Sequence, residues 1–460
     1  MEVAKRLLSK YWKWEYFWLS LIVVGTLILH FLIIARPAEP LFDEAHYIPD
    51  ARNIITQHNT ARGEHPQLGK LAIVSGILTL GDNPWGWRMP AVVFGTAGII
   101  FFYLTCRNLK LSRQASSLAT FILGSENLYF IHAGVAMLDI FMVSMMLLAF
   151  WMYARRSYPA AGVAVALAAL AKFNGVFAIF AIIIHWLVGR RDKPVHFLAS
   201  LVLAGLSFAL LYAAFDFAIY LRLVDFVTGF RNALGSTASL TFITAKHVSE
   251  SRPWEWVFNL EIMPYWYGPH YIALVSFPVW ALIMPTIIYS IFRAIKKDTA
   301  ALFVIAWFIG VYVIWIPLDI VTDRISFIFY FLPTVPGICL GLGMGMEYLI
   351  NFWRTPRPPR ASAAPESTQP LASAVPEAMP PFSTPAAPAL PAPPAPVLIG
   401  LTPPVEPTPA AATPVPARRR RTKLQWAAIS FVALFFLLQI ATFVIVAPPL
   451  NNWHIENWFR

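Results

Sequence analysis

Apolar residues run along this chain in long blocks, and polar residues gather in the connections between the blocks. A helix that crosses a bilayer needs about 20 consecutive, mostly apolar residues. This spacing predicts spans near residues 15–35, 86–106, 114–133, 138–154, 159–172, 174–189, 195–220, 270–292, 299–317, 325–352 and 425–447. The fifth and sixth are short and closely joined, so one long interfacial element is the alternative there. The pattern predicts an all-α, polytopic integral membrane protein with about eleven transmembrane helices.

Basic residues occupy every second connection between these predicted spans. They precede the first span and follow the second, fourth, sixth and eighth, at Lys5–Lys13, Arg107–Arg113, Arg155–Arg156, Arg190–Lys193 and Arg293–Lys297. Cytoplasmic loops of membrane proteins are enriched in Lys and Arg, so the N-terminus is predicted to be cytoplasmic. Residues 36–85 and 221–269 then form two long outer loops. No small-residue cleavage site follows the first apolar run, which predicts a retained span rather than a signal peptide.

Composition agrees with a bilayer environment and excludes other classes. The chain is 58% hydrophobic and only 13% charged, and a soluble core of this length cannot bury that many apolar residues. The net charge of +11 follows from the basic connections and does not indicate nucleic-acid binding. Both cysteines, Cys106 and Cys339, fall in apolar segments and predict neither a disulfide framework nor a metal site.

Three regions of the chain differ in composition. Residues 1–354 form the predicted membrane domain. Residues 355–416 are rich in Pro and Ala without periodicity, which predicts a disordered cytoplasmic linker. Residues 417–460 hold a basic stop, "ARRRRTK", then the last span and a short outer tail. The arginines anchor that span in the simplest interpretation and bind anionic lipid in the alternative. A scaffold whose Pro-rich segment recruits a cytoplasmic partner is a further alternative.

The first outer loop begins with "LFDEAHYIPD", which places Asp43 and Glu44 just beyond the first span. The letters Asp-Glu-Ala-His do not indicate a nucleotide-driven motor, because no phosphate-binding loop lies upstream. A carboxylate pair at the membrane–water boundary can meet the headgroup of a lipid. Asp43 is a candidate general base toward a hydroxyl, with Glu44 orienting it or holding a sugar. The alternative is structural, since carboxylates also favour the first turn of a helix.

Further ionisable residues fall at the outer ends of predicted spans or in the outer loops. Each has a simple structural explanation, such as a lysine that reaches along the interface or an arginine that anchors a span. The residues are His46, His65, Lys70, Arg88, Asp139, Lys172, His247 and Arg324. Four of them, Arg88, Asp139, Lys172 and Arg324, fall at span ends that converge on the outer face, and these predict a site for a charged lipid. The aromatics around His247 belong either to an interfacial belt or to a cleft for a sugar or peptide.

Seven segments, in order from about residue 41 to 333, resemble the motifs of the protein O-mannosyltransferases, within the multi-spanning C-type glycosyltransferases (GT-C). "LFDEAHY" resembles their Asp-Glu motif, "EHPQLGK" their His-Pro-Pro-x-x-Lys segment, and "WRMPAVVFG" their Arg-containing second span. "MLDIF" and "AKFNGVF" are similar to Leu-Leu-Asp and Lys-Trp-x-Gly-Leu-Phe. "HVSESRPWEW" and "RISFIFYFLP" resemble the His-to-Trp loop and the C-terminal Arg-x-x-Phe segment.

The resemblance implies a GT-C fold and an inverting transfer of mannose, or a related hexose, from a polyprenyl phosphate to Ser or Thr of a protein at the extracytoplasmic face. It implies that Asp43 accepts the hydroxyl proton and that Glu44 supports the acceptor or sugar. Cations at Arg88, Lys172, Lys70 and Arg324 would bind the donor phosphate. The remaining outer residues, His46, His65, Asp139 and His247, are then predicted to contact substrate. Membrane lipid is a further expected partner, and nucleic acid is not.

The segments also depart from the family pattern. Gln67 replaces the second proline, Gly134 stands where an arginine often precedes the Leu-Asp motif, and Tyr330 takes a position often held by histidine. No large soluble domain interrupts the second outer loop, and the Pro-rich insertion is not part of the pattern. These departures bear on the acceptor more than on the donor chemistry.

Two alternative functions and one cofactor question follow. The first alternative is a GT-C enzyme that moves another sugar to a lipid or glycan acceptor. The second is a membrane transporter, in which intramembrane charges mark a pathway. Phosphate is a good leaving group, so no cofactor or metal is expected to be required. Asp43, Glu44 and His46 do not have the spacing of a closed metal site, although a divalent metal is not excluded by the sequence.

Overall fold

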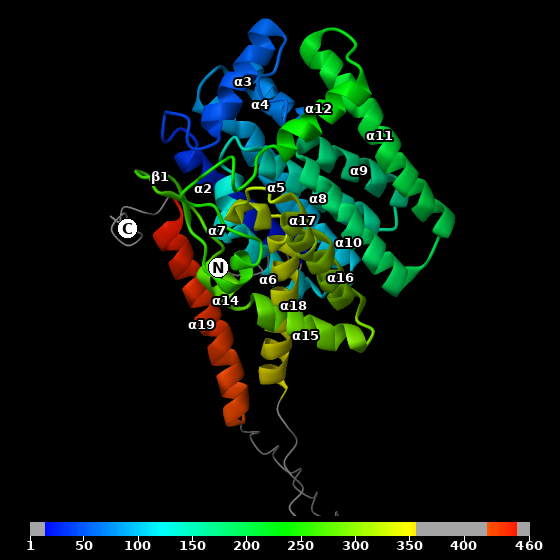
Figure 1. Ribbon diagram of the computed structural model, residues 1–460. Helices are drawn as coiled ribbons and strands as arrows, with labels where there is room; N and C mark the ends of the chain where they lie inside the picture. The colour runs from blue at the N-terminus through cyan, green and yellow to red at the C-terminus, as the bar shows by residue number, and fades with distance from the viewer. Residues whose placement is uncertain (1–13, 356–420, 449–460) are drawn as a thin grey trace, which may run out of the picture.

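The structure is a computed structural model that describes residues 14–355 and 421–448 (Figure 1). The predicted linker at 355–416, apart from Thr355, and the outer tail from residue 449 lie outside the described residues. The described chain is almost entirely helical, which confirms the predicted all-α class. The division into three regions stays a prediction.

The first half of the described chain forms nine α-helices, a 3-10 helix and a π-helical turn. They are α2 (Phe17–Ile33), α3 (Glu44–Gln57), α4 (Gln67–Leu80), α5 (Pro84–Asn108), α6 (Arg113–Gly124), α7 (Asn127–His132), α8 (Leu138–Ala154), α9 (Tyr158–Ala171), η1 (Phe173–Phe177), α10 (Ala178–His185) and η2 (Trp186–Arg190).

The second half adds further helices and one short antiparallel hairpin. Its elements are α11 (Pro194–Tyr220), α12 (Phe226–Ala238), α13 (Glu255–Phe258), β1 (Met263–Trp266), β2 (Tyr271–Ala273), α14 (Phe277–Ala281), α15 (Ile283–Ile295), α16 (Thr299–Trp307), η3 (Phe308–Val313), α17 (Trp315–Thr322), η4 (Ile328–Phe331), α18 (Val335–Arg354) and α19 (Lys423–Val446). Met263 lies opposite Ala273 in the hairpin.

Within the described residues, six helices or helical runs are long and apolar enough to cross a membrane. They are Pro84–Asn108, Phe173–Arg190, Pro194–Tyr220, Thr299–Thr322, Val335–Arg354 and Lys423–Val446. Five shorter apolar helices, α2, α4, α8, α9 and α15, accompany them. The protein is therefore an integral membrane protein with a polytopic helical fold, while the total of eleven spans stays a prediction.

Three predicted spans are wrong in their boundaries. The span predicted at 114–133 breaks between α6 and α7, where the Glu126 side chain caps α7 by accepting from the backbone of Tyr129. In the segment 270–292, Tyr271–Ala273 forms β2, and helix begins only at Phe277. In the segment 325–352, helix α18 begins at Val335. Apolar runs that fold as buried loops or strands have the same composition as spans, so hydropathy alone did not separate them.

The core centres on α8, which is buried along most of its length. It packs between α5 and α9, and α9 in turn packs against α11. Small side chains permit the α9–α11 contact, because a Cβ on Gly162 would lie 2.1 Å from the backbone oxygen of Ser200. Close backbone approach of this kind is how helices associate in membranes, where lipid is as apolar as the side chains.

The C-terminal helix α19 packs beside α18 and makes polar contacts with the end of α18 and with the end of α6. Near its start, Gln425 Nε2 donates to the carbonyls of Phe352 and Thr355 at 2.9 and 2.6 Å. Further along, Gln439 Nε2 donates to the Ser125 carbonyl at 2.8 Å. Arg421 stacks over Trp353 at 3.9 Å, which gives this arginine a protein contact besides any lipid it meets. The chain on either side of the linker therefore meets at one end of the molecule.

Candidate functional site

A polar cavity of about 430 Å³ lies at the N-terminal end of α3. Its walls come from that end of α3, the loop before α4, the turn after α9, the loop after α12 and the segment before α18. Six of the ten residues predicted as site residues line it, although they are spread over most of the membrane domain. They are Asp43, His46, His65, Lys172, His247 and Arg324.

Asp43 stands at the first position before α3 and points its carboxylate into this cavity. A tight turn orients it, in which Phe42 adopts a left-handed backbone (φ 45°) and the Glu44 amide bonds to the Leu41 carbonyl at 2.9 Å. The Asp43 side chain makes no capping hydrogen bond to α3, so the purely structural interpretation of this residue is not realised. Burial raises the pKa of Asp43 to about 6, while the nearby Lys172 ammonium opposes that rise.

Glu44 points the other way, into the protein core, where it forms an ion pair with Arg88. Arg88 Nη2 lies 2.8 Å from Glu44 Oε2, and both side chains are 0% exposed. Glu44 also accepts from the Leu41 and Ala136 amides at 3.1 and 2.8 Å. The guanidinium of Arg88 also donates hydrogen bonds to the carbonyls of Ile34, Pro37 and Glu39.

Glu44 and Arg88, predicted to contact substrate and the donor phosphate, bond to each other and to backbone groups, and those predicted roles stay predictions. Neither residue lines the polar cavity. Their hydrogen bonds tie α3 and α5 to the segment between α2 and α3. The pair holds in place the turn that presents Asp43.

Lys172 and Asp139 form a second buried ion pair, and this one borders the cavity. Lys172 follows α9 in an extended conformation, and Asp139 lies in the first turn of α8. The Lys172 Nζ atom lies 2.8 and 2.9 Å from the two Asp139 carboxylate oxygens. The same ammonium lies 4.8 Å from the centre of the Tyr330 ring. Asp139 itself is fully buried behind Lys172, so it orients the lysine instead of contacting the cavity directly.

Arg324 and His65 both line the wall of this cavity. Arg324 donates to the Thr237 carbonyl, and its second terminal nitrogen lies 3.5 Å from the Tyr330 hydroxyl. Among the described residues, no carboxylate lies within ion-pair distance of Arg324. Burial and the charges of Lys172 and Lys70 hold the pKa of His65 well below its usual range, so its imidazole is neutral.

Two other predicted residues reach the open side of the cavity. The His46 Nδ1 atom lies 2.5 Å from Arg62 Nη2, and burial together with Arg62 lowers the pKa of His46. The exposed His247 packs its ring edge-on against Phe42 and Phe327, with centroids 6.2 and 5.4 Å away. Both imidazoles are accessible to a ligand that enters from this side.

Lys70 was predicted to bind phosphate, but the structure buries it outside the cavity. Its Nζ atom donates to Thr60 Oγ1 at 3.0 Å and to the Arg62 carbonyl at 2.9 Å. Thr60 in turn donates to Asp50 at 2.8 Å. Lys70 therefore stabilises the loop that carries Arg62 and His65, and a donor phosphate in the cavity would not touch it.

Sequence reasoning missed four polar or charged residues of the wall. Tyr330 appeared in the sequence only as a departure from the family pattern, yet its ring lies against both Lys172 and Arg324. Arg62, Glu64 and Tyr47 also line the cavity. The density of charges in the first outer loop was a signal for Arg62 and Glu64, whereas nothing in the local sequence distinguished Tyr47 from a core residue.

Two apolar cavities continue from the polar one. The first, of about 380 Å³, shares the wall residues His65, Lys172, Arg324 and Tyr330 with the polar cavity. The second, of about 420 Å³, lies between α9, α11 and α12 and shares Phe173, Val176 and Leu234 with the first. A polar space thus leads past a cationic junction, formed by Lys172 and Arg324, into apolar space.

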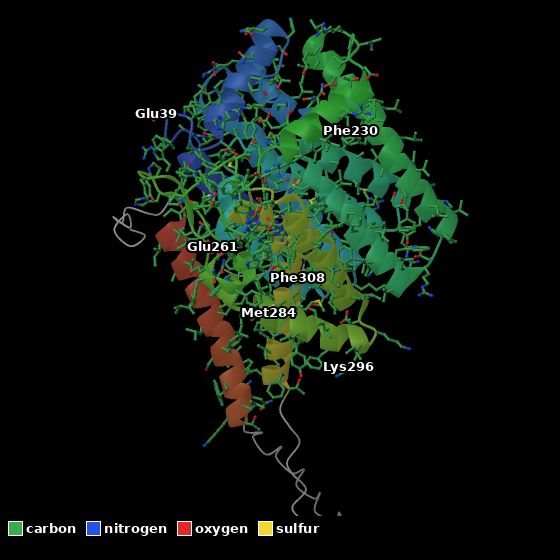
Figure 2. The ribbon with its side chains drawn as sticks, in the orientation of Figure 1. Glu39, Phe230, Glu261, Met284, Lys296 and Phe308 are labelled. Atoms are coloured by element: carbon green, nitrogen blue, oxygen red, sulfur yellow. The ribbon has the colours of Figure 1, made fainter. Side chains whose placement is uncertain are left out.

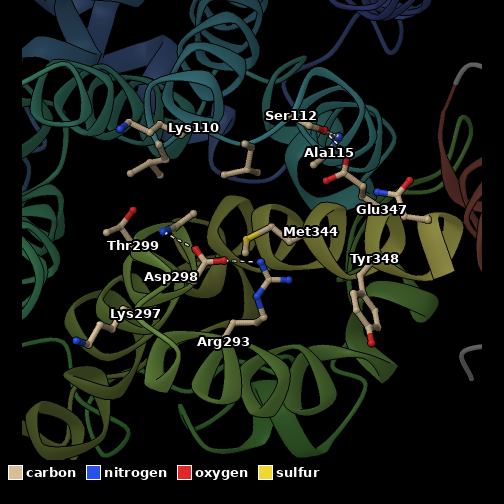
Figure 3. Close-up of a pocket in the computed structure, with 14 residues that line it drawn as sticks. Lys110, Ser112, Ala115, Arg293, Lys297, Asp298, Thr299, Met344, Glu347 and Tyr348 are labelled. Carbon is tan, nitrogen blue, oxygen red and sulfur yellow. Dashed lines mark hydrogen bonds and ion pairs between the residues drawn. The ribbon is translucent and has the colours of Figure 1, made fainter. Parts of the chain in front are cut away.

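A further cavity, of about 470 Å³, lies between the α5–α6 turn, the α15–α16 turn and α18 (Figure 3). Its charges are largely paired within the protein. Arg293 lies 2.6 Å from Asp298, and Ser112 donates to Glu347. Lys296, beside this cavity, lies at the end of the molecule opposite Phe230 of α12 (Figure 2). None of the predicted site residues lines this cavity.

Within residues 14–355 and 421–448, no three His, Cys, Asp or Glu side chains gather in a way that could hold a metal ion. The expectation that the reaction requires no metal stays a prediction.

Comparison with known proteins agrees with the motif resemblance. Residues 64–215 match the family model described as dolichyl-phosphate-mannose-protein mannosyltransferase. A polyprenol-phosphate-mannose–protein mannosyltransferase of Mycolicibacterium smegmatis is 28% identical over 140 residues, which cover 28% of this chain and 27% of that protein. The corresponding protein of Corynebacterium glutamicum is 29% identical over 124 residues, 24% of each chain. The matches thus span about a quarter of these curated relatives.

Solved structures show the fold. The Saccharomyces cerevisiae protein O-mannosyltransferase Pmt1–Pmt2 complex bound to the sugar donor superposes with a TM-score of 0.62 at 12% identity, covering 96% of this chain and 91% of that chain. ArnT from Cupriavidus metallidurans bound to undecaprenyl phosphate gives a TM-score of 0.50 at 17% identity, covering 74% and 63%. The resemblance to the protein O-mannosyltransferases and the GT-C fold predicted from the motifs are both confirmed.

Proposed function

We propose that this chain, which resembles the protein O-mannosyltransferases in sequence and fold, transfers mannose or a related hexose from a polyprenyl phosphate to Ser or Thr of a protein. One observation carries the proposal. The polar cavity that contains Asp43 continues, past Lys172 and Arg324, into two apolar cavities. A lipid-linked sugar has this same order of parts, namely a polar sugar, a phosphate and an apolar chain.

The donor would lie along this path with its sugar in the polar cavity. Its phosphate would then occupy the junction, where Arg324 has no carboxylate partner among the described residues and Lys172 has a third N–H beyond the two that face Asp139. The neutral His65 would supply a hydrogen bond without adding charge. The polyprenyl chain would follow the apolar cavities between α9, α11 and α12.

The transfer would be a single displacement at the anomeric carbon, with inversion. The hydroxyl oxygen of the acceptor attacks that carbon as the bond from the carbon to the phosphate oxygen breaks. Asp43 accepts the hydroxyl proton, and polyprenyl phosphate leaves with the bonding electrons. The cations at the junction stabilise the charge that develops on the phosphate. Asp43 is a much stronger acid than an alcohol, so its proton transfer is late and concerted with the attack.

The proposed reaction takes place at the extracytoplasmic face. The cavity is built from segments that the loop charges assign to the outer side, whereas Lys296, in one of the basic turns, lies at the end of the molecule opposite Phe230 of α12 (Figure 2). Ser or Thr of a secreted or membrane protein would reach Asp43 from the side lined by His46 and His247.

The test is to incubate the purified protein in detergent with polyprenyl-phosphate mannose and a peptide rich in Ser and Thr, and to follow the peptide mass. A gain of one hexose, lost in Asp43→Asn, is the expected result. An unchanged gain in Asp43→Asn would overturn the assignment of the base. The hexose gain should also survive treatment with a chelator, since no metal is expected to be required.

Failure of the wild-type reaction would direct the search to the alternatives. Other polyprenyl-linked sugars with lipid or glycan acceptors would test a different GT-C transferase. A transporter would instead move a labelled solute into proteoliposomes with no transfer to an acceptor. Transporter sites lie near the bilayer midplane, whereas the ionisable residues of this cavity come from helix ends and loops.

A further inference from the structure

A buried carboxylate outside the proposed active site has a single amide partner. Asp216 lies in the last two turns of the apolar helix α11 and is 2% exposed, and Gln67, the first residue of α4, is 3% exposed. Gln67 Nε2 donates to Asp216 Oδ1 at 2.6 Å. Burying a carboxylate costs free energy unless it is paired and hydrogen-bonded, so this contact calls for a physical role.

The surroundings of Asp216 hold no cation at ion-pair distance among the described residues. Lys70, one turn along α4, exerts an attraction, but its ammonium donates to Thr60 and Arg62. Tyr212 and Tyr220 of α11 are the other titratable neighbours. The Gln67 amide is therefore the main described contact that compensates the buried charge.

The Gln67–Asp216 contact joins the segment that carries His65 to the helices that line the apolar cavities. Gln67 follows His65 by two residues, and His65 lines both the polar cavity and the first apolar one. On the other side, α12 packs over Asp216 at Gly229, where an added Cβ would lie 3.6 Å from Asp216 Oδ2. Residues Phe230 and Leu234 of α12 line the apolar cavities.

A second contact ties the same two parts together. Thr237, near the end of α12, donates from its hydroxyl to the Glu64 carbonyl at 2.7 Å. Its own carbonyl accepts from Arg324. The α11–α12 unit is thus bonded to the Glu64–Gln67 segment at two places, through Asp216 of α11 and through Thr237 of α12, and Arg324 of the cationic junction bonds to Thr237.

We propose that Gln67 and Asp216 form a positioning pair that sets the distance between His65 and the α11–α12 unit, and so the width of the junction for the donor phosphate. The inference rests on the proposed function. It also accounts for one departure from the family pattern, because a second proline at position 67 has no side-chain donor and would leave Asp216 without its amide partner.

The decisive variant is Gln67→Glu, which replaces the amide donor by a second carboxyl at the same distance from Asp216. Two carboxylates so close cannot both be ionised, so they must share a proton. At alkaline pH this shared proton is lost and the two carboxylates repel each other. The KM for the polyprenyl donor should then rise by about tenfold or more, the size expected for loss of a hydrogen bond to a charged group. The wild-type KM should not follow this trend.

Two matched variants separate positioning from simple damage. Asp216→Asn keeps an acceptor for the Gln67 amide and should retain the pH profile of the wild type. The double variant Gln67→Glu with Asp216→Asn reverses donor and acceptor across the same contact, and should restore that profile. Failure of the double variant to recover, or a Gln67→Glu profile equal to that of the wild type, would overturn the inference.

A substrate-free measurement keeps the inference distinct from the proposed function. The apparent melting temperature of purified Gln67→Glu should fall more steeply toward alkaline pH than those of the wild type and the double variant. A melting shift without a change in donor KM would reduce the pair to a structural contact and refute its positioning role. If the wild type transfers no sugar, the proposed function fails, and absence of the melting shift would still refute the pair.

Discussion

Asp43 and Glu44 are neighbours in the sequence, yet they occupy opposite kinds of environment. Glu44 is completely buried, forms an ion pair with Arg88 and accepts two backbone amides. Asp43 faces a cavity, has no capping hydrogen bond and has its pKa raised to about 6. The comparison teaches that a motif of two acids can divide its work. Glu44 holds the turn, while Asp43 stays free for the proton transfer that we propose.

The energetic reason lies in how each charge is compensated. A buried carboxylate is stable only when it is paired and hydrogen-bonded, and Arg88 with the Leu41 and Ala136 amides satisfies Glu44. A carboxylate that must accept a proton during a reaction cannot be satisfied in that way. Its environment must leave the ionised form reactive, and partial desolvation opposed by a nearby ammonium does so at Asp43.

The largest expected effect is at Asp43. Asp43→Asn keeps the shape of the side chain and removes the base, so the transfer rate should fall by about 10²–10⁴-fold. The melting temperature should stay at or above that of the wild type, because the raised pKa shows that the ionised form is disfavoured in the folded state. Rate and melting curves measured on the same preparation check both parts. A variant that melts early and is inactive for that reason would contradict the division of roles.

Glu44→Gln should show the reverse pattern. It leaves the fully buried Arg88 guanidinium without its counter-charge, and breaking a buried ion pair from one side costs about 3–5 kcal/mol. We expect a large loss of folded protein and of thermal stability. The molecules that remain folded should transfer sugar with a donor KM close to that of the wild type. A stable Glu44→Gln protein with no activity would mean that Glu44 takes part in the reaction directly.

Arg324→Gln tests the junction, with Arg88 as its counterpart. Both arginines were predicted to bind phosphate, but only Arg324 lines the cavities. Removing a group that stabilises developing charge lowers the rate by about 10²–10³-fold. Initial rates at varied donor concentration measure this loss. Folded Arg88→Gln protein should keep its donor affinity, and a loss of affinity confined to that variant would reverse the assignment.

The pH dependence of kcat/KM follows from the raised pKa of Asp43. The base acts in its ionised form, so activity should decline as pH falls through about 6 and drop about tenfold for each further unit. Assays between pH 5 and 8 with a stability control at each pH measure the profile. Lys172→Met removes the attraction that opposes the rise, so this acid limb should move to higher pH. If the acid side of the kcat/KM profile were unchanged in Lys172→Met, its pKa would belong to a group other than Asp43.

The smallest effect is expected at an exposed ion pair that joins α3 to the turn between α4 and α5. Arg52 of α3 lies 2.7 Å from Asp82, but both side chains are more than 40% exposed. Screening by water and the loss of side-chain entropy reduce the contribution of such a pair to the free energy of unfolding to about 0–1 kcal/mol. Arg52→Ala should therefore change neither melting temperature nor transfer rate appreciably. A large loss in either would show that distance alone, and not burial, decides what a pair contributes here.

The order of the motifs predicted which residues lie together more accurately than hydropathy predicted the ends of the helices. Asp43, Lys172 and Arg324 come from distant segments, and all three line one cavity as the outer-face argument expected. Hydropathy placed α8 correctly at 138–154, but it read the loop at 325–334 as part of a span. That segment is apolar because most of it is buried in the protein, where it forms part of the cavity wall, and burial in protein selects the same side chains as burial in lipid.

The sequence by itself determined the class of the protein, the order of its apolar segments and the chemistry available at their outer ends. Those properties depend on composition and spacing along one chain. The tertiary structure alone decided which of two adjacent acids faces the cavity, which of the predicted cations line it, and that the Gln67 amide donates to Asp216. These outcomes depend on partners 44 to 149 residues apart. Only packing brings such residues together, and the burial that results decides whether a charge is neutralised or left reactive.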